Sequence, residues 1–118
     1  MRWLVVLLAL AAATLPAAPV RAAYDTGADL RQWCADPDGS GFGAVYCLGY
    51  VTAVADVIEH NPVNGLRACV PDAAVVGDLV QRVTAYLDRH PDRLNYGAAG
   101  LVADALGAAY PCPGPAAN

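Results

Sequence analysis

The sequence predicts an all-α fold, a small disulfide-stapled bundle of about four helices. Two patterns favour this class: apolar residues recur at helical spacing between strong helix breakers, and no alternating run is long enough to suggest a sheet. A third observation is the presence of four cysteines in a chain of 118 residues. An even number of cysteines in a small exported domain is typical of disulfides that support a limited core.

The N-terminus has the pattern of a signal peptide. Arg2 precedes the apolar run "WLVVLLALAAA", then "TLPAAP" breaks the helix, and "VRA" supplies small residues for cleavage. A membrane anchor is the alternative, but a run of about eleven apolar residues is short beside the roughly 20 that span a bilayer. We therefore expect a signal peptide over residues 1–22, cleavage after Ala22, and one exported domain over 23–118.

The charge of the expected mature chain limits its partners. It carries five arginines against eleven acids, a net charge near −6, and no lysine. Nucleic acids and anionic lipids are recognised through clustered positive charge, so the composition argues against both. A protein partner with a basic surface would suit this chain better.

Helix breakers divide the domain into four helices. Ser40 suits the N-cap of the second helix, and "NPVNG" ends it. Pro71 and Asp72 suit the start of the third, because a first-turn proline loses no hydrogen bond and an acid meets the positive end of the dipole. Pro91 ends that helix and begins the fourth. The expected helices cover residues 26–34, 40–60, 71–90 and 91–110.

The stretch "CLGYVTAVADVIEH" raises the question of a catalytic cluster. At about 100° per residue, Cys47 lies on the apolar stripe of its helix, whereas Asp56 and His60 fall in the opposite sector. Asp56 and His60 would supply two metal ligands without a third, and His90 suits a helix C-terminal cap. The sequence therefore predicts no catalytic residue, no metal site and no cofactor.

The four cysteines form no C-x-x-C pair, so disulfides are favoured over zinc. If the last three helices run up, down and up, Cys34 and Cys47 lie at one end of the bundle, and Cys69 and Cys112 at the other. Among the three possible pairings we therefore predict Cys34–Cys47 and Cys69–Cys112.

A stripe of small residues on the fourth helix has two interpretations. Glycine inside a helix costs about 1 kcal/mol relative to alanine, so something should need the close approach that it permits. One interpretation is tight helix packing within the domain, and the other is a homodimer or partner face. The stripe consists of Tyr96, Gly100, Ala103 and Gly107.

The loop "HNPVNGLRA" between the second and third helices is the other candidate for partner binding. Val63, Leu66 and Arg67 combine apolar contact with a charged donor, on a turn that a cleft could receive. Alternatively, Leu66 covers the end of the bundle above Cys69. Both interpretations remain open from the sequence.

"CLGYVTAVADV" and "CVPDAAVVGDLVQRVTAYLDRHPDRLNYGAAGLVADALGAAYPC" together resemble the Rap/Tai family of type VI secretion immunity proteins, over about Leu30 to Cys112. The resemblance implies a periplasmic, all-helical protein that neutralises a toxin. In the best-known members the toxin is a peptidoglycan amidase, and a helical dimer occludes its active-site cleft. The alternative is a general periplasmic helical binding or envelope-stress protein without a cognate toxin.

Overall fold

The computed structural model describes residues 24–36 and 41–114, and over these ranges the fold is all-α, as predicted. The predicted signal peptide lies outside the described residues. In chain order the elements are α2 (Gly27–Cys34), α3 (Phe42–His60), α4 (Val76–Arg89), the 3-10 helix η1 (Pro91–Arg93) and α5 (Ala98–Ala109).

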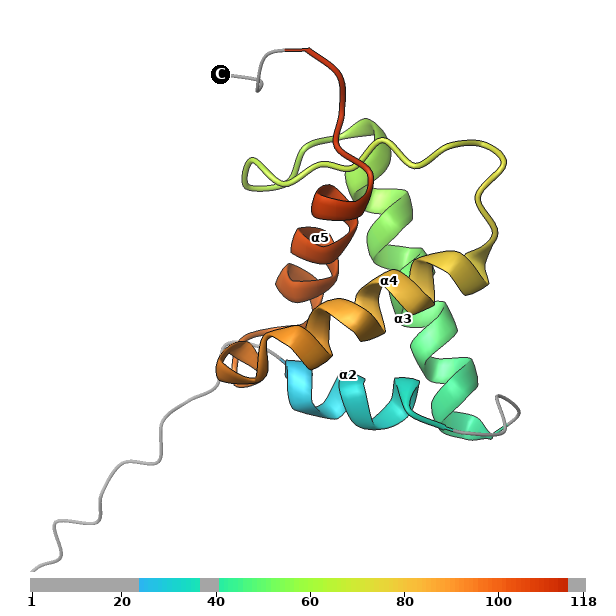
Figure 1. Ribbon diagram of the computed structural model, residues 1–118, viewed down its shortest axis with the longest axis vertical. Coiled ribbons are helices and arrows are strands. Elements are labelled where there is room, and N and C mark those ends of the chain that lie inside the picture. The colour runs from blue at the N-terminus through green and yellow to red at the C-terminus, as the bar shows by residue number, and fades with distance from the viewer. Residues whose placement is uncertain (1–23, 37–40, 115–118) are drawn as a thin grey trace, which may run out of the picture.

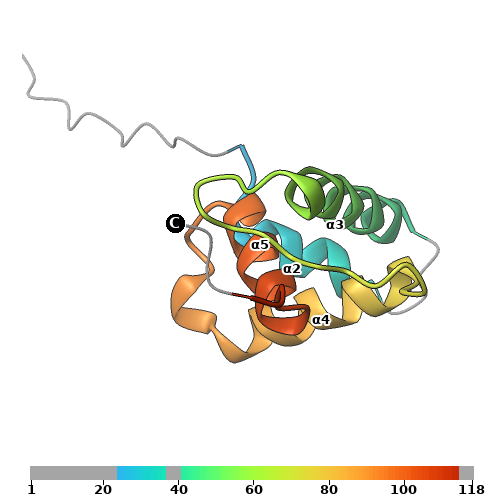
Figure 2. The ribbon, with the colours of Figure 1, turned by 90° about the horizontal axis from the view of Figure 1, so that it is seen from above.

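The helices pack as a compact group in which each α-helix contacts the other three. In Figure 1, α3 and α5 both run upward, and α4 crosses α3 instead of running antiparallel to it. The view from above places α2 between α3 and α4 (Figure 2). The expected up, down and up order is therefore wrong for α4.

The core takes one face from every helix, because the apolar side chains recur at helical spacing. Two predicted stripes meet there: Cys47 and Val51 of α3, and Val83 and Leu87 of α4. The largest fully buried side chains are Leu30, Leu87, Leu101, Leu106, Val51, Val83, Val102 and Cys47.

The start of α2 is fixed by a capping box. The Asp29 backbone N–H donates to the Thr26 hydroxyl oxygen over 3.3 Å, and the Thr26 backbone N–H donates to the Asp29 carboxylate over 2.9 Å. This pair satisfies two N–H groups that a helix start would otherwise leave unpaired.

The predicted fourth helix is interrupted between η1 and α5. Backbone carbonyls in this segment accept hydrogen bonds from the first residues of α2. The Gly27 N–H donates to the Tyr96 carbonyl and the Ala28 N–H to the Leu94 carbonyl, both over 2.9 Å. A Cβ on Gly27 would lie 2.4 Å from the Leu101 side chain and 3.1 Å from the Leu94 Cα. Glycine allows this approach without a shift of Leu101 or of the Leu94 backbone, so the break in the last helix and the glycine in the first belong together.

Two other helix starts differ from the prediction. The N-cap of α3 is Gly41, not Ser40, which lies outside the described residues. The third helix starts at Val76, five residues after Pro71. The Ala74 N–H donates to the Pro71 carbonyl over 2.9 Å, which closes a turn, and Ala74 packs against the core. That turn brings α4 into its crossing position before the helix begins.

Both predicted disulfides are present, Cys34–Cys47 and Cys69–Cys112. The first joins α2 to α3 beside the core, where Cys47 is only 1% exposed. The second joins the segment after α3 to the residues just beyond α5. Next to it, the Cys69 N–H donates to the Tyr110 carbonyl over 2.9 Å.

Removal of the two disulfides should have unequal effects on stability. They span sequence separations of 13 and 43 residues. In the chain-entropy model such loops contribute about 3 and about 4 kcal/mol, so Cys69→Ser should lower the free energy of unfolding more than Cys34→Ser, by about 1 kcal/mol. Denaturant unfolding of the mature protein measures this difference. A larger loss for Cys34→Ser, or a Cys47–Cys69 peptide in a non-reducing digest, would contradict the assignment.

Candidate functional site

The loop predicted to bind a partner forms an ordered two-residue turn. Val63 and Leu66 exchange backbone hydrogen bonds of 3.0 and 2.9 Å, and Asn64 and Gly65 between them have φ angles of 52° and 77°. Positive φ at both central positions defines a type I′ turn, for which Asn-Gly is the preferred sequence. The turn holds Val63 at the surface, 42% exposed.

The turn forms one wall of an open apolar groove of about 390 Å³, which we call the α3 groove. Its walls come from three segments of the chain, and Asn64 has the only polar side chain among the lining residues that the structure describes. The α3 groove is lined by Ala53, Val54, Val57 and Ile58 of α3, Val63, Asn64 and Leu66 of the turn, and Ala99, Gly100 and Ala103 of α5.

The three predicted partner-binding residues have different positions. Val63 is exposed at the edge of the groove, whereas Leu66 is half-buried and packs against the core while it lines the groove. Leu66 thus covers part of the core, as one of the two interpretations expected, while contact of Leu66 with a partner stays a prediction. Arg67 is half-buried and does not line the groove.

The predicted small-residue stripe is divided among separate roles. A Cβ on Gly107 would lie 3.0 Å from the Arg67 carbonyl oxygen, so this glycine lets the segment after the turn lie close to α5. Gly100 is exposed in the groove, and a Cβ there would meet nothing within 4 Å. Ala103 is 4% exposed, and Tyr96 is 56% exposed beside Arg93. The exposed members for a homodimer face are therefore Tyr96 and Gly100, and self-association stays a prediction.

The groove residues on α3 were not predicted, because helical periodicity puts Val57 at the edge of the core stripe. In the structure Val57 is 54% exposed, and Ala53 is also exposed. The sequence contained one signal for this exposed surface, since α3 has sufficient length and apolar composition to cross a membrane. In the structure only 22% of Phe42–Glu59 is buried. A helix that is apolar on nearly all sides has more apolar surface than one core can cover.

An aromatic row leads along α3 toward the groove. The ring centroids of Phe42 and Tyr46 are 6.3 Å apart and those of Tyr46 and Tyr50 are 6.1 Å apart, and Phe42 is 84% exposed. The Tyr46 hydroxyl donates to the Asp25 carboxylate over 2.9 Å. This hydrogen bond raises the pKa of Tyr46, and burial followed by the Asp25 charge raises the pKa of Tyr50.

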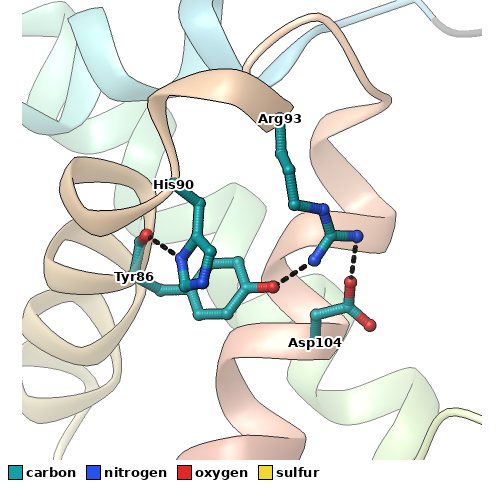
Figure 3. A network of polar contacts seen from close by, with 4 residues as sticks. All are labelled: Tyr86, His90, Arg93 and Asp104. Atoms are coloured by element: carbon teal, nitrogen blue, oxygen red, sulfur yellow. Dashed lines mark hydrogen bonds and ion pairs between the residues drawn. The ribbon is translucent and has the colours of Figure 1, made fainter.

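A polar network fastens η1 to α4 and α5 (Figure 3). Arg93 donates to the Tyr86 hydroxyl and, over 2.7 Å, to the Asp104 carboxylate. The hydrogen bond to Asp104 raises the pKa of Arg93. His90 donates from Nδ1 to the Tyr86 carbonyl over 2.7 Å, and its ring stacks on Tyr86. His90 is therefore a helix C-terminal cap, as predicted, and the network has a structural role.

The structure removes the thiol that a Cys/His/Asp cluster would need. Cys47 is buried and bonded to Cys34, so its sulfur cannot act as a nucleophile. Within residues 24–36 and 41–114, no group of three or more His, Cys, Asp or Glu side chains is arranged to hold a metal ion. The groove is apolar, and its chemistry suits binding of apolar groups.

Loss of the Arg93 contacts should lower the melting temperature. Arg93→Met keeps most of the side-chain length but removes the ion pair and the bond to Tyr86. Arg89→Met, on the exposed last turn of α4, is the matched control. Because the Arg93–Asp104 pair is only partly buried, high salt should reduce the difference between wild type and Arg93→Met. Equal melting temperatures for the two variants would contradict the role of the network.

Comparison with known proteins gives one family. The family model of the Rap1a immunity proteins matches residues 26–112. No curated protein matches the chain significantly. The matched range includes every described helix and all four cysteines, so the similarity extends over the whole folded domain. An immunity protein acts as an inhibitor of a cognate toxin and not as an enzyme. The chain therefore belongs to the Rap1a immunity protein family.

Proposed function

We propose that this protein is exported to the periplasm and there neutralises a peptidoglycan amidase delivered by type VI secretion, by occluding the active-site cleft of the amidase. Membership of an immunity family supports a toxin partner. The two disulfides support an oxidising compartment such as the periplasm. The resemblance of "CLGYVTAVADV" and of the segment from Cys69 to Cys112 to the Rap/Tai family supports an amidase as the target.

The observation that carries the occlusion mechanism is the ordered turn at Asn64-Gly65. A turn closed by two backbone hydrogen bonds is already in one conformation, so little conformational entropy is lost when a cleft receives it. Val63 offers an exposed apolar side chain on this turn. A rigid projection of this kind excludes substrate without any chemistry of its own.

The direct experiment is inhibition of a peptidoglycan amidase toxin of a type VI secretion system. The mature protein should stop hydrolysis of purified peptidoglycan at close to equimolar concentration. Because occlusion makes inhibitor and substrate exclude each other, a soluble muropeptide that already occupies the cleft should slow formation of the inhibited complex. A rate of inhibition that does not change with muropeptide concentration would contradict occlusion of the cleft.

The turn should be essential for this inhibition. Val63→Asp places a charge on an exposed side chain, so the melting temperature should change little, but toxin binding should weaken at least tenfold, about 1.4 kcal/mol. Val75→Asp is the matched control, because Val75 is 62% exposed at the N-cap of α4 and does not line the groove. Calorimetric titration of both variants with the toxin measures the effect. Equal affinities for the two variants would contradict the role of the turn.

A further inference from the structure

We infer that the α3 groove receives an apolar side chain from a positively charged segment of the toxin, with the acids beside the groove pairing with a neighbouring lysine or arginine. This inference rests on the proposed function, since it specifies which chemistry of the partner the groove recognises. It concerns the groove between α3 and α5 and not the insertion of the turn into a catalytic cleft.

The groove has the form of a receptor for a side chain. Its volume of about 390 Å³ is at the lower end of the range for ligand sites, roughly 300–1,000 Å³, and it is open to solvent. The small side chains of Ala53 and Ala99 and the absent one of Gly100 leave its centre unfilled. An apolar side chain inserted there would be removed from water by apolar walls.

The charged residues beside the groove indicate the charge of the toxin segment that carries the inserted side chain. Asp56 is exposed and directly precedes Val57, which lines the groove. On the α5 side, the Ala98 N–H donates to the Asp25 carbonyl over 2.9 Å, and Ala98 directly precedes the groove residue Ala99. Among the residues whose side chains the structure describes, no arginine or histidine lines the groove.

The Asp25 carboxylate lies beside the aromatic row of α3, because it accepts the hydrogen bond from the Tyr46 hydroxyl over 2.9 Å. Asp25 and Asp56 are thus two acidic residues near the groove with which a basic segment can pair. Opposite charges across an interface accelerate association and suppress wrong partners, so a basic segment fits best.

Two other occupants fit less well. A fatty acid or anionic lipid would bring its own negative charge beside Asp56, and no basic side chain that the structure describes lines the groove to receive it. A second copy of the chain would bring the same acids, Asp25 and Asp56, against one another. The expected mature chain also has a net charge near −6, which opposes pairing of identical faces.

Selection from a random peptide library displayed on phage tests this chemistry whatever the identity of the toxin. The bait is the intact mature protein, with both disulfides formed. Enriched peptides should share a large apolar residue within a few positions of lysine or arginine. The most enriched peptide, made synthetically with a fluorescent label, then serves as the probe. Absence of enrichment, or enrichment of acidic peptides, would overturn the inference.

Matched variants locate the probe in the groove. Gly100→Leu fills the groove without a backbone clash and should reduce probe affinity at least tenfold, whereas Gly77→Leu, also with open space at its Cβ but on α4, should not. Asp56→Asn should weaken binding and reduce its salt dependence, with Asp88→Asn on α4 as the control. Laurate should not displace the probe. Equal binding by Gly100→Leu and Gly77→Leu, or displacement by laurate, would contradict the proposed occupant.

The same variants separate this inference from the proposed function. If Gly100→Leu still inhibits the amidase as well as wild type, while Val63→Asp does not, the groove inference fails and occlusion by the turn stands. If no amidase is inhibited but basic apolar peptides bind the groove, the proposed target fails and the recognition chemistry of the groove stands.

Discussion

Attachment of the segment after α3 to the end of α5 is the constraint on which the candidate site depends. Three contacts make it: the Cys69–Cys112 disulfide, the bond from the Cys69 N–H to the Tyr110 carbonyl, and the close approach of the Arg67 carbonyl to Gly107. Together they fix the segment over α5, so that the Asn64-Gly65 turn stands beside α3 and closes one side of the groove. The glycine that the sequence marks as costly in a helix is what permits this approach.

The apolar side chains of α3 lie partly in the core and partly on the surface that we propose the toxin contacts. One side of this helix contributes Cys47, Val51 and Ile58 to the core, while Phe42 and Val57 remain largely exposed. Exposed apolar surface of this kind gives nothing to the folding of a single domain, and its presence beside an unfilled groove supports the proposed interaction surface. The Arg93 network and the Cys34–Cys47 disulfide lie elsewhere and hold the helices in place, so the proposed binding residues differ from the residues that stabilise the fold.

The parts of the fold that were predictable from sequence are those set by local patterns. Helical periodicity identified the apolar stripes, and the positions of the cysteines led to the correct pairing even though α4 crosses α3. The break at Leu94–Gly97 was not predictable, because it depends on carbonyls that accept from the distant Gly27 and Ala28. The turn residues were identified, but the groove was not, since its walls meet only when three segments fold together. Gly100 and Ala103 were recognised as part of an unusual stripe of small residues. The sequence did not predict that they line a groove together with the turn.

Immunity by this account requires a preformed surface, in which a rigid turn and an apolar groove act side by side on one toxin. The most direct test is a methyl NMR titration of the mature protein with its cognate toxin, because each methyl signal reports on one position of the surface. The account predicts that the methyl signals of Val57 and Val63 shift or broaden on complex formation, while those of Val75 at the start of α4 stay unchanged. Changes at Val75 with none at Val57 and Val63 would place the toxin on α4 and contradict the account.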